Sequence, residues 1–91
     1  MSIRDELRKI LTIISDLTDN ETNTTVKDIQ IILEANRSSE EVDEFLNGLQ
    51  SLEYIKEYKF KPADADYKLY QITKKGKKEI YNKGSRLVYH R

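Results

Sequence analysis

The sequence contains no cysteine, and it has only one proline and one histidine. Without cysteine, the chain can form no disulfide, use no thiol nucleophile and build no cysteine-ligated metal site. No apolar run approaches the roughly 20 residues that a membrane-spanning helix needs. The first ten residues, MSIRDELRKI, carry acidic side chains where a secretion signal would have an apolar core. We therefore expect a cytoplasmic protein with no membrane segment.

The residue patterns of a catalytic site are also missing. The 91 residues contain no glycine-rich phosphate loop, no nucleophile next to a base and no metal-ligand spacing. The only histidine, His90, lies next to the last residue of the chain. We expect neither enzymatic activity nor a bound cofactor.

Charged side chains are abundant and unevenly distributed. They make up 35% of the chain, against 37% hydrophobic residues, which is typical of one small domain with a modest core. Residues 1–53 carry five basic and twelve acidic side chains, and residues 54–91 carry eleven basic and four acidic ones. The formal net charge of zero therefore combines −7 and +7. Such asymmetry suggests nucleic-acid contact or head-to-tail association.

Apolar spacing predicts two helices in the first third of the chain. The first has an apolar stripe formed by Ile3, Leu7, Ile10, Leu11, Ile14 and Leu17. After the turn TDNETN, the second is expected to begin at TTVKD, where Thr25 and Asp28 approximate a capping box. Its expected buried face is formed by Val26, Ile29, Ile32 and Leu33. Ile31 falls outside this face, so we expect it to pack on the first helix or on another subunit.

A third helix follows the short turn EANR. Ser38 and Glu41 form a complete S-x-x-E capping box at its start. The expected inward face of this helix is formed by Val42, Phe45, Leu46, Leu49 and Leu52. A short helix, a tight turn and another helix predict a helix-turn-helix motif.

The second half of the chain predicts a β-hairpin and a last helix. YIKEYKFK (54–61) and YKLYQIT (67–73) alternate with period two, and PADAD forms the turn between them. We expect Tyr54, Tyr58 and Tyr70 to be core residues with exposed hydroxyls. Thr73 can cap a helix that ends at Gly84. The apolar residues of the following tail, Leu87, Val88 and Tyr89, are expected to pack on the first helix or join a partner chain.

Two motifs carry a resemblance to a known superfamily. LQSLEYI resembles the L-x-x-L-G-[YLF]-I exit of the recognition helix in winged-helix proteins, with Glu53 where glycine is usual. YQITKKGKKEI resembles the Y-x-L-T-x-x-G-x-x-x-[LI] segment that enters their last helix, with Thr73 and Gly76 in register. From about Ile3 to Tyr81, the chain resembles the small winged-helix regulators of archaea and their viruses and plasmids, which overlap the MarR and PadR types.

The resemblance implies an α+β winged helix at residues 1–84, with a three-helix helix-turn-helix core, a β-hairpin wing and a C-terminal helix, followed by a tail at residues 85–91. It also implies a homodimer that binds double-stranded DNA and regulates transcription. In this superfamily the base-facing positions are often Thr, Ser, Arg, Gln or Lys. Here they fall on Glu41, Asp43, Glu44 and Asn47, and Arg37 occupies a position that is usually apolar.

We expect the following residues to contact DNA: Asn36, Arg37, Ser38, Ser39, Asn47, Lys56, Lys59, Lys61 and Lys68. The first four would bind phosphates at the start of the third helix, helped by its backbone N–H groups. Asn47 is the expected neutral base reader. The wing lysines would clamp adjacent phosphates, unless they are ordinary surface lysines.

The acidic start of the third helix leaves alternatives open. It is formed by Glu40, Glu41, Asp43 and Glu44. These carboxylates can be a solvated first turn that suits the positive helix end, a surface that repels phosphates and rejects poor sites, a docking face for a basic protein, or, with least support, a metal site. The second candidate function is therefore a winged helix that binds a protein through this helix. A third is an architectural DNA binder that has no preferred site.

Overall fold

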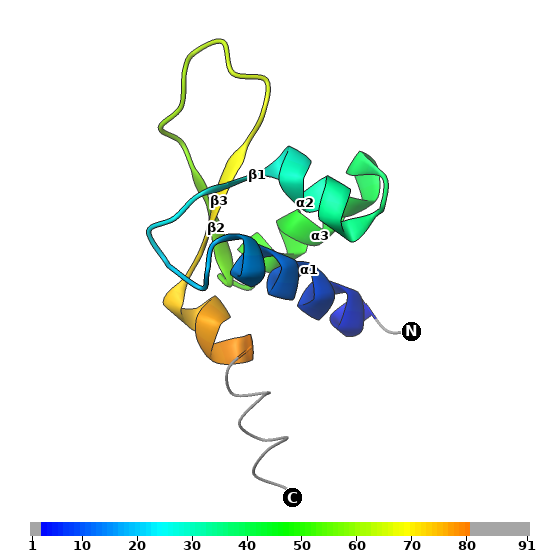
Figure 1. Ribbon diagram of the computed structural model, residues 1–91. Helices are drawn as coiled ribbons and strands as arrows, with labels where there is room; N and C mark the ends of the chain where they lie inside the picture. Colours follow the sequence, from blue (N-terminus) through cyan, green and yellow to red (C-terminus); the bar gives the residue numbers. More distant parts are fainter. Residues whose placement is uncertain (1–2, 81–91) are drawn as a thin grey trace, which may run out of the picture.

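The computed structural model describes residues 3–80 of the chain. In chain order its helices and strands are α1 (Ile3–Leu17), β1 (Val26–Lys27), α2 (Asp28–Ala35), α3 (Ser39–Ser51), β2 (Ile55–Tyr58) and β3 (Leu69–Ile72). Residues 74–80 are helical as well. The three labelled helices pack together on one side, and the loop between β2 and β3 projects from the body as a wing (Figure 1). The predicted tail at residues 85–91 and the helix end at Gly84 lie outside the described residues.

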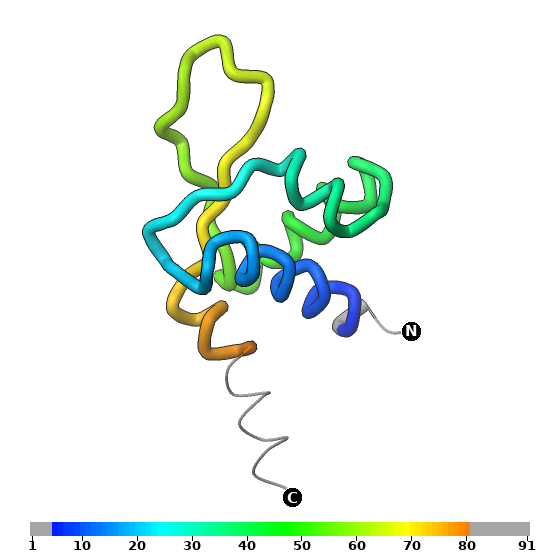
Figure 2. Tube along the Cα trace, viewed as in Figure 1, coloured from blue at the N-terminus to red at the C-terminus, as the bar shows by residue number. Residues whose placement is uncertain are grey.

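The strands form a small antiparallel sheet with the order β1-β3-β2. The predicted hairpin is confirmed, because β2 pairs with β3 from Ile55 opposite Ile72 to Tyr58 opposite Leu69. Strand β1 was not predicted. Figure 2 shows its segment crossing to the base of the wing, where Val26 lies opposite Tyr70.

The predicted start of the second helix is wrong. Val26 and Lys27 are extended, and the helix begins only at Asp28, whose N–H donates to the carbonyl oxygen of Lys68 at 2.9 Å. The N–H of Lys27 donates to Oε1 of Gln30 at 3.1 Å, so the predicted box between Thr25 and Asp28 does not form. Pairing with β3 outweighs the local helix signal, because tertiary context readily overrides propensity.

Every helix and strand contributes to one core. The buried apolar residues are Ile10, Leu11, Ile14, Val26, Ile31, Val42, Leu46, Leu49, Ile55, Tyr70 and Ile72. They confirm the stripe of α1 at Ile10, Leu11 and Ile14, with Leu7 and Leu17 partly buried beside them. They also confirm most of the inward face of α3, although Leu52, one residue beyond α3, is exposed. The predicted face of α2 is wrong, since Ile31 is fully buried while Ile29 and Leu33 are 48% and 75% exposed. The face that packs against the core is formed by Ile31 with the partly buried Ile32 and Ala35.

The Thr-x-x-Gly motif joins the end of α3 to the last helix. The hydroxyl of Thr73 donates to the carbonyl oxygen of Glu53 at 2.7 Å and accepts from the N–H of Gly76 at 3.0 Å, which confirms the predicted cap. The N–H of Thr73 donates to the carbonyl oxygen of Tyr54 at 3.0 Å. A Cβ on Gly76 would lie 2.2 Å from that same carbonyl oxygen. Only glycine therefore permits this close packing.

The backbone conformation of Glu53 explains why the motif that this segment resembles has glycine at this position. Its φ of 67° is left-handed, which costs a residue with a side chain roughly 1–2 kcal/mol. Glycine avoids this cost but loses more chain entropy on folding, by roughly 0.5–1 kcal/mol. We expect Glu53→Gly to raise the free energy of unfolding by ~0.5–1 kcal/mol in urea denaturation. Glu44→Gly, on the exposed face of α3, should instead lower it by ~1 kcal/mol; equal losses in both variants would refute the strain at Glu53.

Ionisation of the buried Tyr70 hydroxyl is expected to lower the stability of the fold at alkaline pH. Burial of its ring raises its pKa from 10.0 to about 12, and the nearby carboxylates of Glu57, Asp28 and Asp43 add to the rise. The unfolded chain loses this proton near pH 10 and the folded chain near pH 12. Between these values the unfolded state binds fewer protons, so stability falls as pH rises.

We expect this loss to be of the order of 2 kcal/mol between pH 10 and 12. Denaturant titrations across that range measure it. Tyr70→Phe is the control, because it retains the ring but has no ionisable hydroxyl there. Its stability should fall less over the same interval, and an identical fall in both proteins would contradict the assignment.

Candidate nucleic-acid interface

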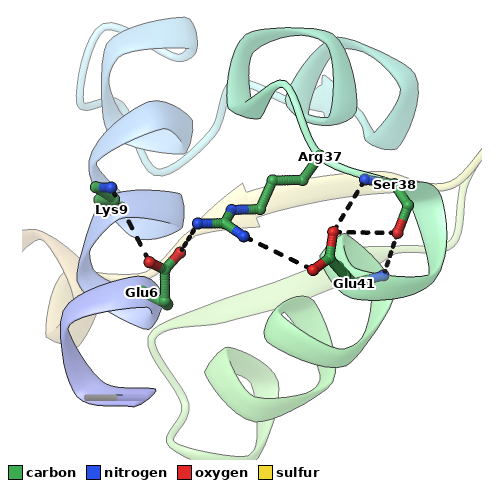
Figure 3. A network of polar contacts seen from close by, with 5 residues as sticks. All are labelled: Glu6, Lys9, Arg37, Ser38 and Glu41. Atoms are coloured by element: carbon green, nitrogen blue, oxygen red, sulfur yellow. Dashed lines mark hydrogen bonds and ion pairs between the residues drawn. The ribbon is translucent and has the colours of Figure 1, made fainter. Parts of the chain in front are cut away.

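The turn between α2 and α3 is built from local hydrogen bonds. Asn36 has the left-handed conformation (φ 55°, ψ 46°) that ends α2, and its N–H donates to the carbonyl oxygen of Ile32 at 3.1 Å. Asparagine tolerates this conformation better than most residues. At the start of α3, the hydroxyl of Ser38 accepts from the N–H of Glu41 at 3.2 Å, and Oε1 of Glu41 accepts from the N–H of Ser38 at 3.3 Å. The predicted capping box is confirmed (Figure 3).

Arg37 connects this turn to α1. Its Nη2 lies 3.0 Å from Oε1 of Glu6, and its Nη1 lies 3.7 Å from Oε2 of Glu41 (Figure 3). The side chain of Glu6 is only 12% exposed, and Nζ of Lys9 lies 4.0 Å from its other oxygen. A partly buried carboxylate left without a cation would be costly. Arg37 therefore holds the start of α3 against α1.

The acidic side chains of α3 do not form a single face. Glu40, Glu41, Asp43 and Glu44 are all exposed. Glu41 is turned toward Arg37, whereas Asp43 is close enough to Tyr70 to help raise the pKa of that hydroxyl. The carboxylates thus spread around the helix start, from the α1 side to the sheet side. Asn47 is exposed one turn further along α3.

The predicted wing lysines occupy three kinds of environment. Nζ of Lys59 lies 3.7 Å from a carboxylate oxygen of Glu57. Nζ of Lys61 donates to the carbonyl oxygen of Tyr67 at 2.5 Å across the loop. Lys56 on β2 and Lys68 just before β3 are exposed. All four lie on the hairpin, so the structure brings the predicted lysines together on the wing.

The sequence reasoning missed two features of the wing. Lys27 reaches it through β1, and its Nζ lies 4.6 Å from the ring centroid of Tyr67. Phe60 falls within the predicted strand segment 54–61, but it lies beyond β2 and is 83% exposed. The two residues Val26 and Lys27 are too few to show the alternation that predicts a strand. The lysines on either side of Phe60 were the one sequence feature that indicated an exposed segment.

A second basic cluster surrounds the start of the last helix. Lys74, Lys77 and Lys78 line a shallow pocket of about 350 Å³ together with Asn20 from the loop after α1. This helix lies at the end of the molecule away from the wing loop (Figure 1). The wing lysines and the lysines of the last helix therefore lie on two separate surfaces of the part of the chain that the structure describes.

Residues 3–80 contain no group of three or more histidine, cysteine, aspartate or glutamate side chains that could hold a metal ion. Within the same range, no helix has the length and hydrophobicity needed to cross a membrane.

Comparison with solved structures identifies the fold. A mutant of MepR from a multidrug-resistant S. aureus clinical isolate superposes with a TM-score of 0.70 and 18% identity, covering 86% of this chain and 53% of that one. A mutant of Lactococcus lactis ZitR in its apo form gives 0.70 and 17%, covering 97% and 61%. Another ZitR structure, described as a zinc-responsive MarR family member, gives 0.61 and 19%, covering 92% and 56%. The chain has a MarR-like winged-helix fold.

This result confirms the α+β winged helix expected from the two sequence motifs. At these identities the likeness is one of fold, and the chain spans between about half and three fifths of the length of the matched chains. No protein-family model and no curated protein matches the sequence. In a winged helix, α2 and α3 form the helix-turn-helix and the β2–β3 hairpin is the wing.

Proposed function

We propose that this protein binds double-stranded DNA and regulates transcription, with the wing as its main contact and the start of α3 as its second. The observation that carries the proposal is the placement of charge on a winged helix. Four lysines of the strongly basic half project from the hairpin, which is the element that this fold can lay along the phosphate backbone. In Figure 1 the wing loop lies at the top, and α2 and the start of α3 lie below it on the right.

The start of α3 offers phosphate contacts that carry little sequence information. Asn36, Ser38 and Ser39 are exposed there, next to the first backbone N–H groups of the helix. Arg37 keeps 33% of its side chain exposed, so it can meet a phosphate while Glu6 fixes its position. Asn47 is the neutral side chain on the exposed face that can read a base. The carboxylates beside it, Glu41 and Glu44, would repel phosphates of poorly placed duplexes.

Selection from random-sequence duplexes tests this function. Purified protein should recover a shared sequence motif after several rounds at low salt. A variant with Lys56, Lys59, Lys61 and Lys68 replaced by glutamine should recover none, because it lacks the wing charge needed to hold any duplex. Absence of duplex binding by the wild-type protein would refute the proposal, and the acidic start of α3 would then be tested as a protein-docking face. Binding without a recovered motif would identify an architectural DNA binder.

We also propose that the protein is a homodimer. Ile29 and Leu33 are exposed one turn apart on α2, and the sequence places further apolar residues in the tail outside the described residues. Ile31, which was expected to pack on the first helix or on another subunit, is buried within the subunit, so it offers no surface to a partner. Closed two-fold dimers are the commonest assemblies and match the symmetry of many DNA sites.

Sedimentation equilibrium at micromolar concentration measures the assembly. We expect a mass of twice 10.7 kDa. A mass of 10.7 kDa at all concentrations up to that range would contradict the dimer.

A further inference from the structure

Phe60 is the most exposed large apolar side chain of the described residues, at 83%. It lies on the wing, where β2 has ended and the loop to β3 begins. Burying a phenylalanine side chain is favourable in free energy, and the fold leaves this one in solvent. An apolar ring in such a place can gain that free energy only from another molecule.

The ring of Phe60 is held next to another aromatic residue. Its centroid lies 6.1 Å from that of Tyr58, with an angle of 46° between the two planes. Tyr58 pairs with Leu69 in the sheet, whereas Ile55 pairs with Ile72 in the core. The pairing alternates between two faces of the sheet, so Tyr58 belongs to the face opposite to the Ile55 pair. The aromatic pair therefore gives the outer side of the wing a partly ordered apolar edge.

Lysine residues flank Phe60 on both sides in the sequence. Lys59 and Lys61 flank Phe60 directly, and each is steered by a contact within the wing, to Glu57 and to the carbonyl oxygen of Tyr67 respectively. A protein-binding surface has little use for lysines around its apolar centre, because lysine is depleted in such interfaces. An apolar side chain between two cations instead matches the minor groove of DNA, where bases lie between two rows of phosphates.

We infer that Phe60 is an apolar wedge that enters the minor groove of duplex DNA and opens a base step, while the lysines on either side hold the phosphates. The inference rests on the proposed DNA-binding function and adds a means of choosing sites. Because opening a step costs least at flexible steps such as TA and CA, the wedge favours sequences that deform easily. Recognition through the deformability of the DNA suits a recognition helix such as α3, whose exposed start is acidic and has few groups for direct base contacts.

The test compares an intact 20-base-pair duplex with the same duplex carrying a one-nucleotide gap, which removes most of the cost of opening the step. Fluorescence anisotropy at fixed salt gives both affinities. We expect the wild-type protein to bind the gapped duplex ~10-fold more tightly, since opening one step costs a few kcal/mol and each 1.4 kcal/mol is tenfold. Phe60→Ala should reduce this preference to about 1, and Phe60→Leu, which keeps an apolar wedge, should retain most of it.

Two matched variants separate the wedge from general effects. Leu52→Ala truncates an exposed apolar side chain at the end of α3, and Lys59→Gln removes a charge next to Phe60. Both should keep the preference for the gapped duplex, although Lys59→Gln should weaken binding to both duplexes. If Phe60→Ala keeps the preference while all proteins bind DNA, the wedge is refuted and the proposed function stands. If single strands are bound in preference to both duplexes, stacking on single strands replaces the wedge. If the wild-type protein binds no DNA, both proposals fail.

Discussion

Replacing Lys59, Lys61 and Lys68 together with alanine is expected to lower the slope of log affinity against log salt concentration by roughly 3 × 0.9. Each lysine that meets a phosphate releases a counterion, and the slope counts these events. Affinity should fall by a similar factor for all duplexes, because phosphate contacts carry no sequence information. The contact of Lys59 with Glu57 does not prevent this role, since an exposed ion pair is worth only about 0–1 kcal/mol. Lys61 donates one hydrogen bond to the carbonyl oxygen of Tyr67, which leaves its other N–H donors for a phosphate.

The lysines of the last helix provide a control with the same change of charge. Lys74, Lys77 and Lys78 lie at the other end of the molecule from the wing loop. Replacing these three with alanine should leave the salt slope almost unchanged. Similar losses in the two triple variants would mean that net charge drives binding, and that the wing has no special position on DNA.

Truncation of a buried leucine side chain in α1 is expected to produce the largest loss of stability. Leu11 is 1% exposed and packs in the core that α1 shares with α2, α3 and the sheet. Leu11→Ala should lower the free energy of unfolding by ~2–5 kcal/mol, through lost burial and the cavity that remains. That is a large share of the total for a small domain.

Leu52→Ala is the matched control for this prediction. It removes the same atoms from a side chain that is 43% exposed, so its effect should be well below that of Leu11→Ala. Urea denaturation of the three proteins measures both values. Should Leu11→Ala unfold at the same urea concentration as the wild-type protein, α1 would not be part of the core.

The local features of the fold could be predicted from the sequence. The stripe of α1, the Ser38 capping box and the Thr73 cap each depend on residues a few positions apart, and all three are confirmed. The two strands of the wing followed from alternation of apolar and polar residues. These signals were sufficient to place the helix-turn-helix and the hairpin in order.

The features that were missed depend on contacts between distant segments. Strand β1 has two residues and exists only because β3 offers a free edge. The face of α2 was wrong because a run of three isoleucines and a leucine within eight residues defines no unique stripe. The contact of Arg37 with Glu6 joins residues from α1 and the turn, so no local pattern could show that this predicted phosphate ligand also supports the fold.

The salt dependence of duplex binding by the wild-type protein tests the central claim most directly. A fluorescent duplex of random sequence is titrated with the protein at several salt concentrations. We expect measurable binding at low salt and a linear fall of log affinity with log salt, with a slope of about −3 or steeper if at least the three wing lysines meet phosphates. Absence of binding at the lowest salt, or an affinity that does not change with salt, would contradict a DNA-binding wing.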